Sequence, residues 1–186
     1  RLVVNSQSKV IYPRCFKGDI RKIYAQGEVF LEVAHDKKHP FIVESDDFKL
    51  QVLGTKFNIS NYKGGTTNIV LVEGAVEVTD KNEKKARLNP NDLLNIANGT
   101  IAYQKQVDVA EYISWVEGIM LLNGNDLSQI IQRLSIYYGI SIQCDPIIGK
   151  EKVYGKLDLK DDIDEVIECI QQTLPFTIEK SDTSIY

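Results

Sequence analysis

Two histidines, His35 and His39, are the side chains of this 186-residue sequence best suited to binding a transition metal. On a helix, a His-x-x-x-His pair places both imidazoles on one face, as a zinc site requires. Here a charged triplet separates the two histidines and Pro40 follows them, a pattern typical of an exposed turn. The pair is therefore predicted not to bind a metal.

An acidic cluster, Asp161, Asp162, Asp164 and Glu165, offers the oxygen ligands that calcium prefers. The cluster also lies where a helix is expected to begin. Acidic side chains at a helix start accept hydrogen bonds from free backbone N–H groups and interact favourably with the helix dipole. We interpret the cluster as a helix cap.

No pairing of a nucleophile with a base stands out. The serines are scattered without a GxSxG motif, and no histidine is placed to act as their base. Gly64-Gly65-Thr66-Thr67 lacks the lysine of a phosphate-binding loop. The sequence thus predicts no catalytic residue, no cofactor and no metal site, and a protein that is not an enzyme.

Cys15, Cys144 and Cys169 are odd in number and form no CxxC motif. This excludes the usual zinc spacings and a dense disulfide framework. We interpret the three as small, partly buried apolar residues, with a single Cys144–Cys169 bridge left open for an oxidising compartment.

The composition, 43% apolar and 26% charged residues, is that of an ordinary globular protein. No apolar run approaches the roughly 20 residues that span a bilayer. Residues 1–110 hold 16 basic and 13 acidic side chains, and residues 111–186 hold 6 and 13. No basic footprint for nucleic acid is present, and the acidic second half favours a basic protein surface as partner.

The elements of the first half are organised by an internal repeat: an apolar strand, a glycine and another apolar strand. The three copies centre on Gly27, Gly54 and Gly74. Such a repeat is typical of stacked β units that share one core, so residues 1–107 are expected to form an all-β, solenoid-like domain. The three glycines are predicted to be structural, at points where a strand turns or packs closely.

The hydrophobic period changes after Asp108, which can cap a short helix in a linker over residues 108–117. Residues 118–186 are then expected to hold a duplicated βαβ domain, making the whole chain α+β. The first copy has strands at 118–122 and 140–144 and a helix at 127–138. The second has strands at 153–159 and 176–179 and a helix at 163–174. The two helices should pack on small sheets.

Several segments, in order, resemble the periplasmic domain of FecR-like anti-sigma factors. They are Asn5–Pro13, Gly27–Val33, His39–Val43, Val52–Ile59 and Leu71–Val76, with a looser match at Leu88–Asp92, where the family more often has Pro-Gly. The second half is similar to the C-terminal companion domain of that family, and to the short N-terminal domain of secretins and TonB-dependent receptors. The segments that carry this likeness are Trp115–Gly118, Leu127–Tyr138 and Gly155–Leu157.

The resemblance implies the periplasmic portion of a single-pass inner-membrane protein of Gram-negative bacteria. Such a protein relays a signal from the signalling domain of an outer-membrane TonB-dependent transducer. It passes the signal to an extracytoplasmic-function sigma factor held by a cytoplasmic segment. This chain contains neither that segment nor a membrane helix, so it would be the sensor region alone, with protein partners and no nucleic acid.

Short sheet edges can accept a partner strand. We expect the transducer to dock on the last segment of the second half, through Phe176, Ile178, Ile185 and Tyr186. A paired internal strand remains open as the alternative for this segment. A carbohydrate-binding β-module remains open for the whole chain, with aromatic rings that could stack on sugars. These are Tyr62, Tyr103, Tyr112, Trp115 and Tyr137.

Overall fold

The computed structural model describes residues 1–177, and the chain divides into two compact units, Arg1–Tyr112 and Ile113–Tyr186. The division falls inside the segment 108–117 that was expected to link two domains. Helix α1 (Ala110–Ile113) lies at this division. Its start is capped as predicted, because Asp108 Oδ1 accepts a hydrogen bond of 3.0 Å from the Ala110 N–H.

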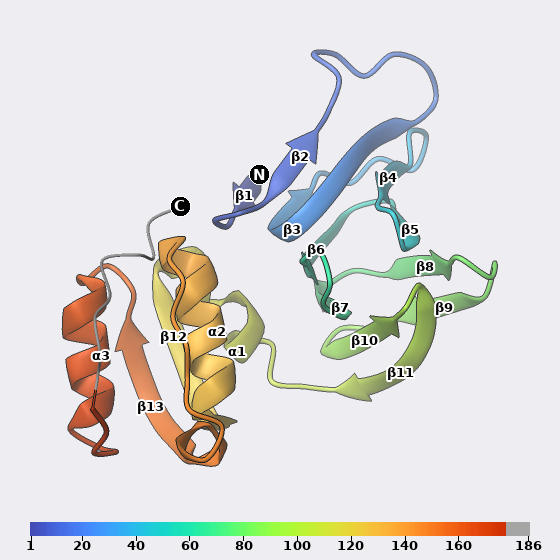
Figure 1. The fold of residues 1–186 in the computed structure, drawn as a ribbon. Helices are drawn as coiled ribbons and strands as arrows, with labels where there is room; N and C mark the ends of the chain where they lie inside the picture. The colour runs from blue at the N-terminus through green and yellow to red at the C-terminus, as the bar shows by residue number, and fades with distance from the viewer. Residues whose placement is uncertain (178–186) are drawn as a thin grey trace. The chain divides into compact units, whose positions relative to one another are not determined.

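The first unit is built from one mixed sheet of eleven strands (Figure 1). Its strands are β1 (Leu2–Val4), β2 (Lys9–Ile11), β3 (Arg21–Val33), β4 (Phe41–Glu44), β5 (Phe48–Val52), β6 (Thr55–Asn61), β7 (Thr67–Glu73), β8 (Val76–Asp80), β9 (Lys85–Leu88), β10 (Asp92–Ala97) and β11 (Thr100–Gln106). The strand order is β11-β10-β7-β6-β3-β4-β5-β8-β9, and β1 and β2 also pair with β3.

The long strand β3 joins two halves of this sheet. Its first part, Arg21 to Tyr24, pairs with β4, and its second part, Gly27 to Val33, pairs with β6. One half contains β2, β4, β5, β8 and β9, and the other contains β1, β6, β7, β10 and β11. Both halves contribute side chains to one apolar core, which includes Leu50 and Val78 from the first half and Phe57 and Leu71 from the second.

The two ends of the strand order, β9 and β11, are joined by side chains. Gln104 Nε2, on β11, donates to the Arg87 carbonyl on β9 at 3.3 Å and to Asp92 Oδ2 at 2.8 Å. Asp92 is buried and also accepts from the Asn89 N–H at 2.7 Å. These bonds hold the sheet in a nearly closed form.

The first unit is all-β, as predicted, but it does not stack its repeats as a solenoid would. Strands that follow one another along the chain, such as β5 and β6, lie in different halves of the sheet. Long-range pairing with β3 therefore sets the architecture, and the three copies of the repeat are not equivalent layers.

The second unit contains two helices and a two-stranded antiparallel sheet. Its elements are η1 (Ser114–Glu117), β12 (Ile119–Asp126), α2 (Leu127–Tyr138), η2 (Ile148–Lys150), β13 (Lys152–Asp158) and α3 (Ile163–Gln171). Helix α2 has the predicted bounds and buries Leu127, Ile130, Ile131 and Leu134 on one face. Within residues 1–177, no helix has the length and hydropathy needed to cross a bilayer.

Each of the two expected copies has its first strand and its helix, but the duplicated βαβ fold is not confirmed. The prediction of a strand at 140–144 is wrong, because that segment pairs with no strand of the described chain. Its apolar side chains Ile142 and Cys144 instead pack against the core of the second unit. In the other copy, Phe176 and Thr177 lie in no strand, and the rest of the strand expected there falls outside the described residues.

Candidate functional site

The three repeat glycines lie where the chain passes between the two halves of the first unit. Gly27 sits at the point in β3 where pairing with β6 begins. Gly54 connects β5 to β6, and Gly74 connects β7 to β8. The backbone φ angles of Gly27 (+89°) and Gly74 (+96°) lie in the region that favours glycine.

Close packing explains why these corners have no side chain. A Cβ on Gly54 would lie 2.5 Å from the Cα of His35, and one on Gly74 would lie 2.8 Å from the Gly54 carbonyl oxygen. A Cβ on Gly27 would overlap Ser8. The geometry is that of structural corners, and the effect of these glycines on stability stays a prediction.

A polar network in the first unit escaped the sequence analysis. Glu28 Oε1 accepts from Asn58 Nδ2 at 3.0 Å, and Glu28 Oε2 accepts from Asn5 Nδ2 at 2.8 Å. The Glu28 N–H donates to Ser8 Oγ at 2.8 Å. The network fixes the connection between β1 and β2 against β3. The sequence did contain one sign of this network: the polar residue Asn58 stands between the apolar residues Phe57 and Ile59 of β6.

Tyr62, which directly follows β6, contacts the same connection between β1 and β2. Its hydroxyl donates to the Ser6 carbonyl at 3.1 Å, and burial raises the pKa of Tyr62 to about 12. The Asn5–Pro13 segment thus begins with residues that have structural partners, so its first part is a packing element and not a ligand site.

An open hollow of about 410 Å³ lies between the β4–β5 turn and the β8–β9 hairpin. Two of its lysines are paired with carboxylates that also line it: Lys81 Nζ lies 2.8 Å from Asp47 Oδ1, and Lys85 Nζ lies 2.8 Å from Glu77 Oε1. The hydrogen bond with Asp47 raises the pKa of Lys81. No histidine or cysteine is among the described residues that line the hollow, and nothing in it pairs a nucleophile with a base.

The candidate metal ligands have other partners. His39 Nδ1 lies 2.7 Å from Asp36 Oδ2, and this hydrogen bond lowers the pKa of Asp36. Asp162 accepts from the Asp164 N–H at 2.9 Å as the cap of α3, which confirms the interpretation of the acidic cluster. In the part of the chain that the structure describes, no three metal-ligating side chains gather in one place.

The three thiols are free in the structure, so the Cys144–Cys169 alternative is not formed there. Cys15 and Cys169 are exposed, and Cys144 is half-buried. Burial raises the pKa of the Cys144 thiol.

Of the predicted docking residues, only Phe176 falls within the described chain. Its side chain is half-buried against the core of the second unit. Its carbonyl accepts a hydrogen bond of 2.7 Å from Gln171 Nε2. Ile178, Ile185 and Tyr186 lie outside the described residues, so docking at this segment stays a prediction.

The aromatic residues considered for sugar stacking divide between the two units. Trp115 is 7% exposed, and the ring of Tyr137 meets that of Tyr138 edge to face at 5.2 Å. Tyr103 is exposed on β11, where Lys105 Nζ lies 5.8 Å from the centre of its ring. Of the five, Tyr103 alone is exposed, Tyr62, Tyr112 and Tyr137 are half-buried, and Trp115 is buried.

Comparison with known proteins gives the same two-part division. The family model described as "FecR protein" matches residues 1–77, and the model described as "FecR, C-terminal" matches residues 119–186. The comparison with curated proteins gives no match.

Two crystal structures of a "putative anti-sigma factor" from Parabacteroides distasonis ATCC 8503, at 1.65 Å and 2.50 Å resolution, are similar to this chain. Each is 29% identical in sequence, and the alignments cover 98% of this chain and 86% of theirs, with TM-scores of 0.82 and 0.81. Both domains of the family are therefore present in order, and the chain belongs to the FecR family of anti-sigma factors.

Proposed function

We propose that this chain is the periplasmic sensor region of a transmembrane anti-sigma factor. In this proposal it receives a signal from an outer-membrane TonB-dependent transducer and relays it to an extracytoplasmic-function sigma factor. The observation that carries the proposal is the order of the two family matches, one on each compact unit. The family implies a membrane-anchored protein, and the anchor and the sigma-binding segment would be contributed by the rest of that protein.

The architecture supports contact with proteins as the mode of action. Two lysines of the hollow in the first unit are paired with carboxylates there, and the buried Asp92 of the same unit is hydrogen-bonded within it. Each strand of the β12–β13 pair has one edge with no partner among the described residues. Such an edge can accept a strand from a transducer's signalling domain, and the segment from Phe176 onward is the other candidate for that contact.

A transcription reporter in cells tests the relay. The full-length protein would be compared with a version that lacks residues 113–186, in a strain carrying the transducer and a promoter read by the sigma factor. We expect the truncated protein to abolish the response to the inducing ligand, because the docking unit is removed. An equal response from both proteins, at equal protein levels, would contradict the proposal.

A matched variant separates loss of docking from loss of folding. Gln132→Ala changes an exposed position of α2 and should leave the response intact. Ile178→Pro should reduce it, because proline removes the N–H that a paired strand donates.

A further inference from the structure

The connection between β2 and β3, residues 12–20, is the most exposed apolar segment of the described chain. Every residue from Ile11 to Ile20 is exposed. The large apolar side chains that it presents to solvent are Ile11 (52% exposed), Tyr12 (63%), Phe16 (39%) and Ile20 (48%). Side chains of this size rarely gather in one short exposed segment without a binding partner.

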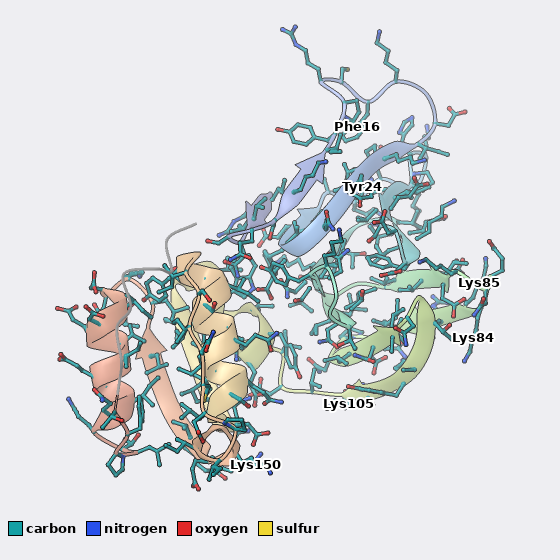
Figure 2. All side chains as sticks on the ribbon, viewed as in Figure 1. Phe16, Tyr24, Lys84, Lys85, Lys105 and Lys150 are labelled. Carbon is teal, nitrogen blue, oxygen red and sulfur yellow. The ribbon has the colours of Figure 1, made fainter. Side chains whose placement is uncertain are left out.

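The loop contacts the rest of the first unit through the ring of Phe16, at its middle. Figures 1 and 2 show it extending beyond the ends of β2 and β3. The ring of Phe16 meets that of Phe41 edge to face at 6.2 Å, and Arg21 lies 5.6 Å above the same Phe41 ring. No atom lies within 4 Å of the position that a Cβ on Gly18 would occupy. The loop is therefore a projection that packs one ring, Phe16, against the unit and leaves the space beside Gly18 open.

Basic residues are interleaved with these apolar ones. Lys9, Arg14 and Lys17 flank the exposed side chains, and Asp19 is the one acidic residue between positions 9 and 20. Over the described chain, none of these three cations has an ion pair within 4.0 Å, whereas Lys22, which follows the loop, pairs with Glu44 at 2.7 Å. The segment thus presents free positive charge beside exposed aromatic and aliphatic groups.

We propose that residues 9–20 bind the surface of an anionic lipid bilayer. Tyr12 and Ile20 would enter the boundary between head groups and acyl chains, where amphipathic rings are favoured. Arg14 and Lys17 would meet lipid phosphates, to which they are complementary in charge. Basic side chains interleaved with exposed aromatic and aliphatic ones favour a bilayer surface over a protein partner, because lysine is depleted at the cores of protein interfaces.

The proposal concerns only residues of the first unit, so it does not depend on the transducer relay. Its direct test is co-sedimentation of the 186-residue chain with vesicles. One set would contain phosphatidylglycerol mixed with phosphatidylcholine, and the other phosphatidylcholine alone. We expect binding to the anionic vesicles that weakens as salt is raised, because salt screens charges beyond about 10 Å at 0.1 M.

Paired substitutions separate the two contributions to binding. Arg14→Gln with Lys17→Gln should weaken partitioning by about fivefold for each cation removed. Tyr12→Ser with Ile20→Ser should weaken it by about tenfold or more, since two buried apolar groups are lost. Tyr103→Ser with Lys105→Gln, an exposed Tyr–Lys pair on β11, is the matched control and should change partitioning by less than about twofold.

The cysteines allow the contact to be located. Two single-cysteine variants would be made, both with Cys144→Ala. In the first, Cys169→Ser leaves Cys15 to carry an environment-sensitive dye. In the second, Cys15→Ser leaves Cys169 to carry it. We expect anionic vesicles to shift the emission of the loop dye to shorter wavelength and to leave the α3 dye unchanged. An equal response from both dyes, or from neither, would overturn the assignment to the loop.

Three other outcomes would also overturn the proposal. The first is equal binding to both kinds of vesicle, and the second is loop variants that bind as the β11 control does. The third is self-association of the wild-type chain in sedimentation velocity that the Tyr12/Ile20 variant abolishes. The last result would assign the loop to a contact between two copies of the chain.

Discussion

Gly54 and Gly74 meet at one corner of the first unit, where the chain crosses between the halves of its sheet. A Cβ on Gly74 would lie 2.8 Å from the Gly54 carbonyl oxygen, and one on Gly54 would lie 2.5 Å from the backbone of His35. Backbone atoms cannot move aside as a flexible side chain can. At the residue scale, the repeat therefore specifies close backbone approach and not a binding group.

Replacing Gly54 with valine should destabilise the first unit by about 3 kcal/mol or more, because overpacking against backbone forces the corner apart. Urea unfolding followed by far-UV circular dichroism measures the change. Gly65→Val is the control: that glycine is exposed, and a Cβ there would meet only the Tyr62 carbonyl oxygen, at 3.4 Å. If Gly54→Val were as stable as the wild type, the repeat would have no structural meaning.

Asp80 organises the β8–β9 hairpin and ties it to β11. The buried carboxylate accepts from the N–H groups of Asn82 and Lys84, each at 2.9 Å, and of Ile101 at 3.0 Å. The hydrogen bond from Ile101 is the largest cause of a pKa for Asp80 below its ordinary value of 3.8. The ionised form is thus favoured in the folded protein.

This depressed pKa predicts a pH-dependent contribution to stability. The contribution is fully present above the unfolded pKa near 3.8 and is lost as the pH falls through the lower, folded pKa. Asp80→Asn should therefore destabilise the first unit at pH 7, and its difference from the wild type should shrink near pH 3. Urea midpoints at the two pH values measure this. Asp19→Asn, in the exposed β2–β3 loop, controls for the charge. A difference that stayed constant with pH would contradict the role given to the carboxylate.

At the element scale, helix α2 could be predicted because its apolar spacing and the glycine that follows it indicate the same bounds, Leu127–Tyr138. It ends at Gly139, whose φ of +69° forms the left-handed cap. Ile130 is fully buried on its core face. Local signals of this kind fix an element before its neighbours are known.

Ile130→Ala should lower the free energy of unfolding of the second unit by about 2–5 kcal/mol, the usual cost of a large-to-small change in a core. The chain has a single tryptophan, Trp115, which is buried in this unit, so its emission follows the transition. Gln132→Ala on the exposed face should have an effect below about 0.5 kcal/mol. Equal effects of the two variants would contradict the assignment of the buried face.

Other elements could not be predicted from local pattern. The segment 140–144 alternates as a strand does, yet it buries its apolar side chains on the second core without a strand partner. The first unit's strand order depends on pairings of β3 with strands far along the chain, which alternation cannot specify. The bonds of Glu28 to Asn5 and Asn58 likewise join residues 23 and 30 positions apart. Sequence reasoning found the β and α character, the caps at Asp108 and Asp162 and the stop at Gly139, but not these long-range partners.

At the scale of the whole molecule, the chain consists of two compact units, each with its own apolar core. The first unit has a nearly closed sheet, and the second has a small sheet with open edges and two helices. Each unit carries one of the two family matches, which is consistent with separate roles, and the second unit is the one we propose to receive the transducer.

The binding of this chain to the signalling domain of a TonB-dependent transducer from the same organism tests the central claim most directly. Isothermal titration calorimetry should give saturable binding in equal proportions. Ile178→Pro, with its fold verified by circular dichroism, should weaken this binding about tenfold or more, the cost of losing strand pairing hydrogen bonds at an edge. Tyr103→Ser in the first unit should leave it unchanged. Absence of binding, or an affinity unaltered by Ile178→Pro in a folded chain, would contradict docking through the last segment of the second unit.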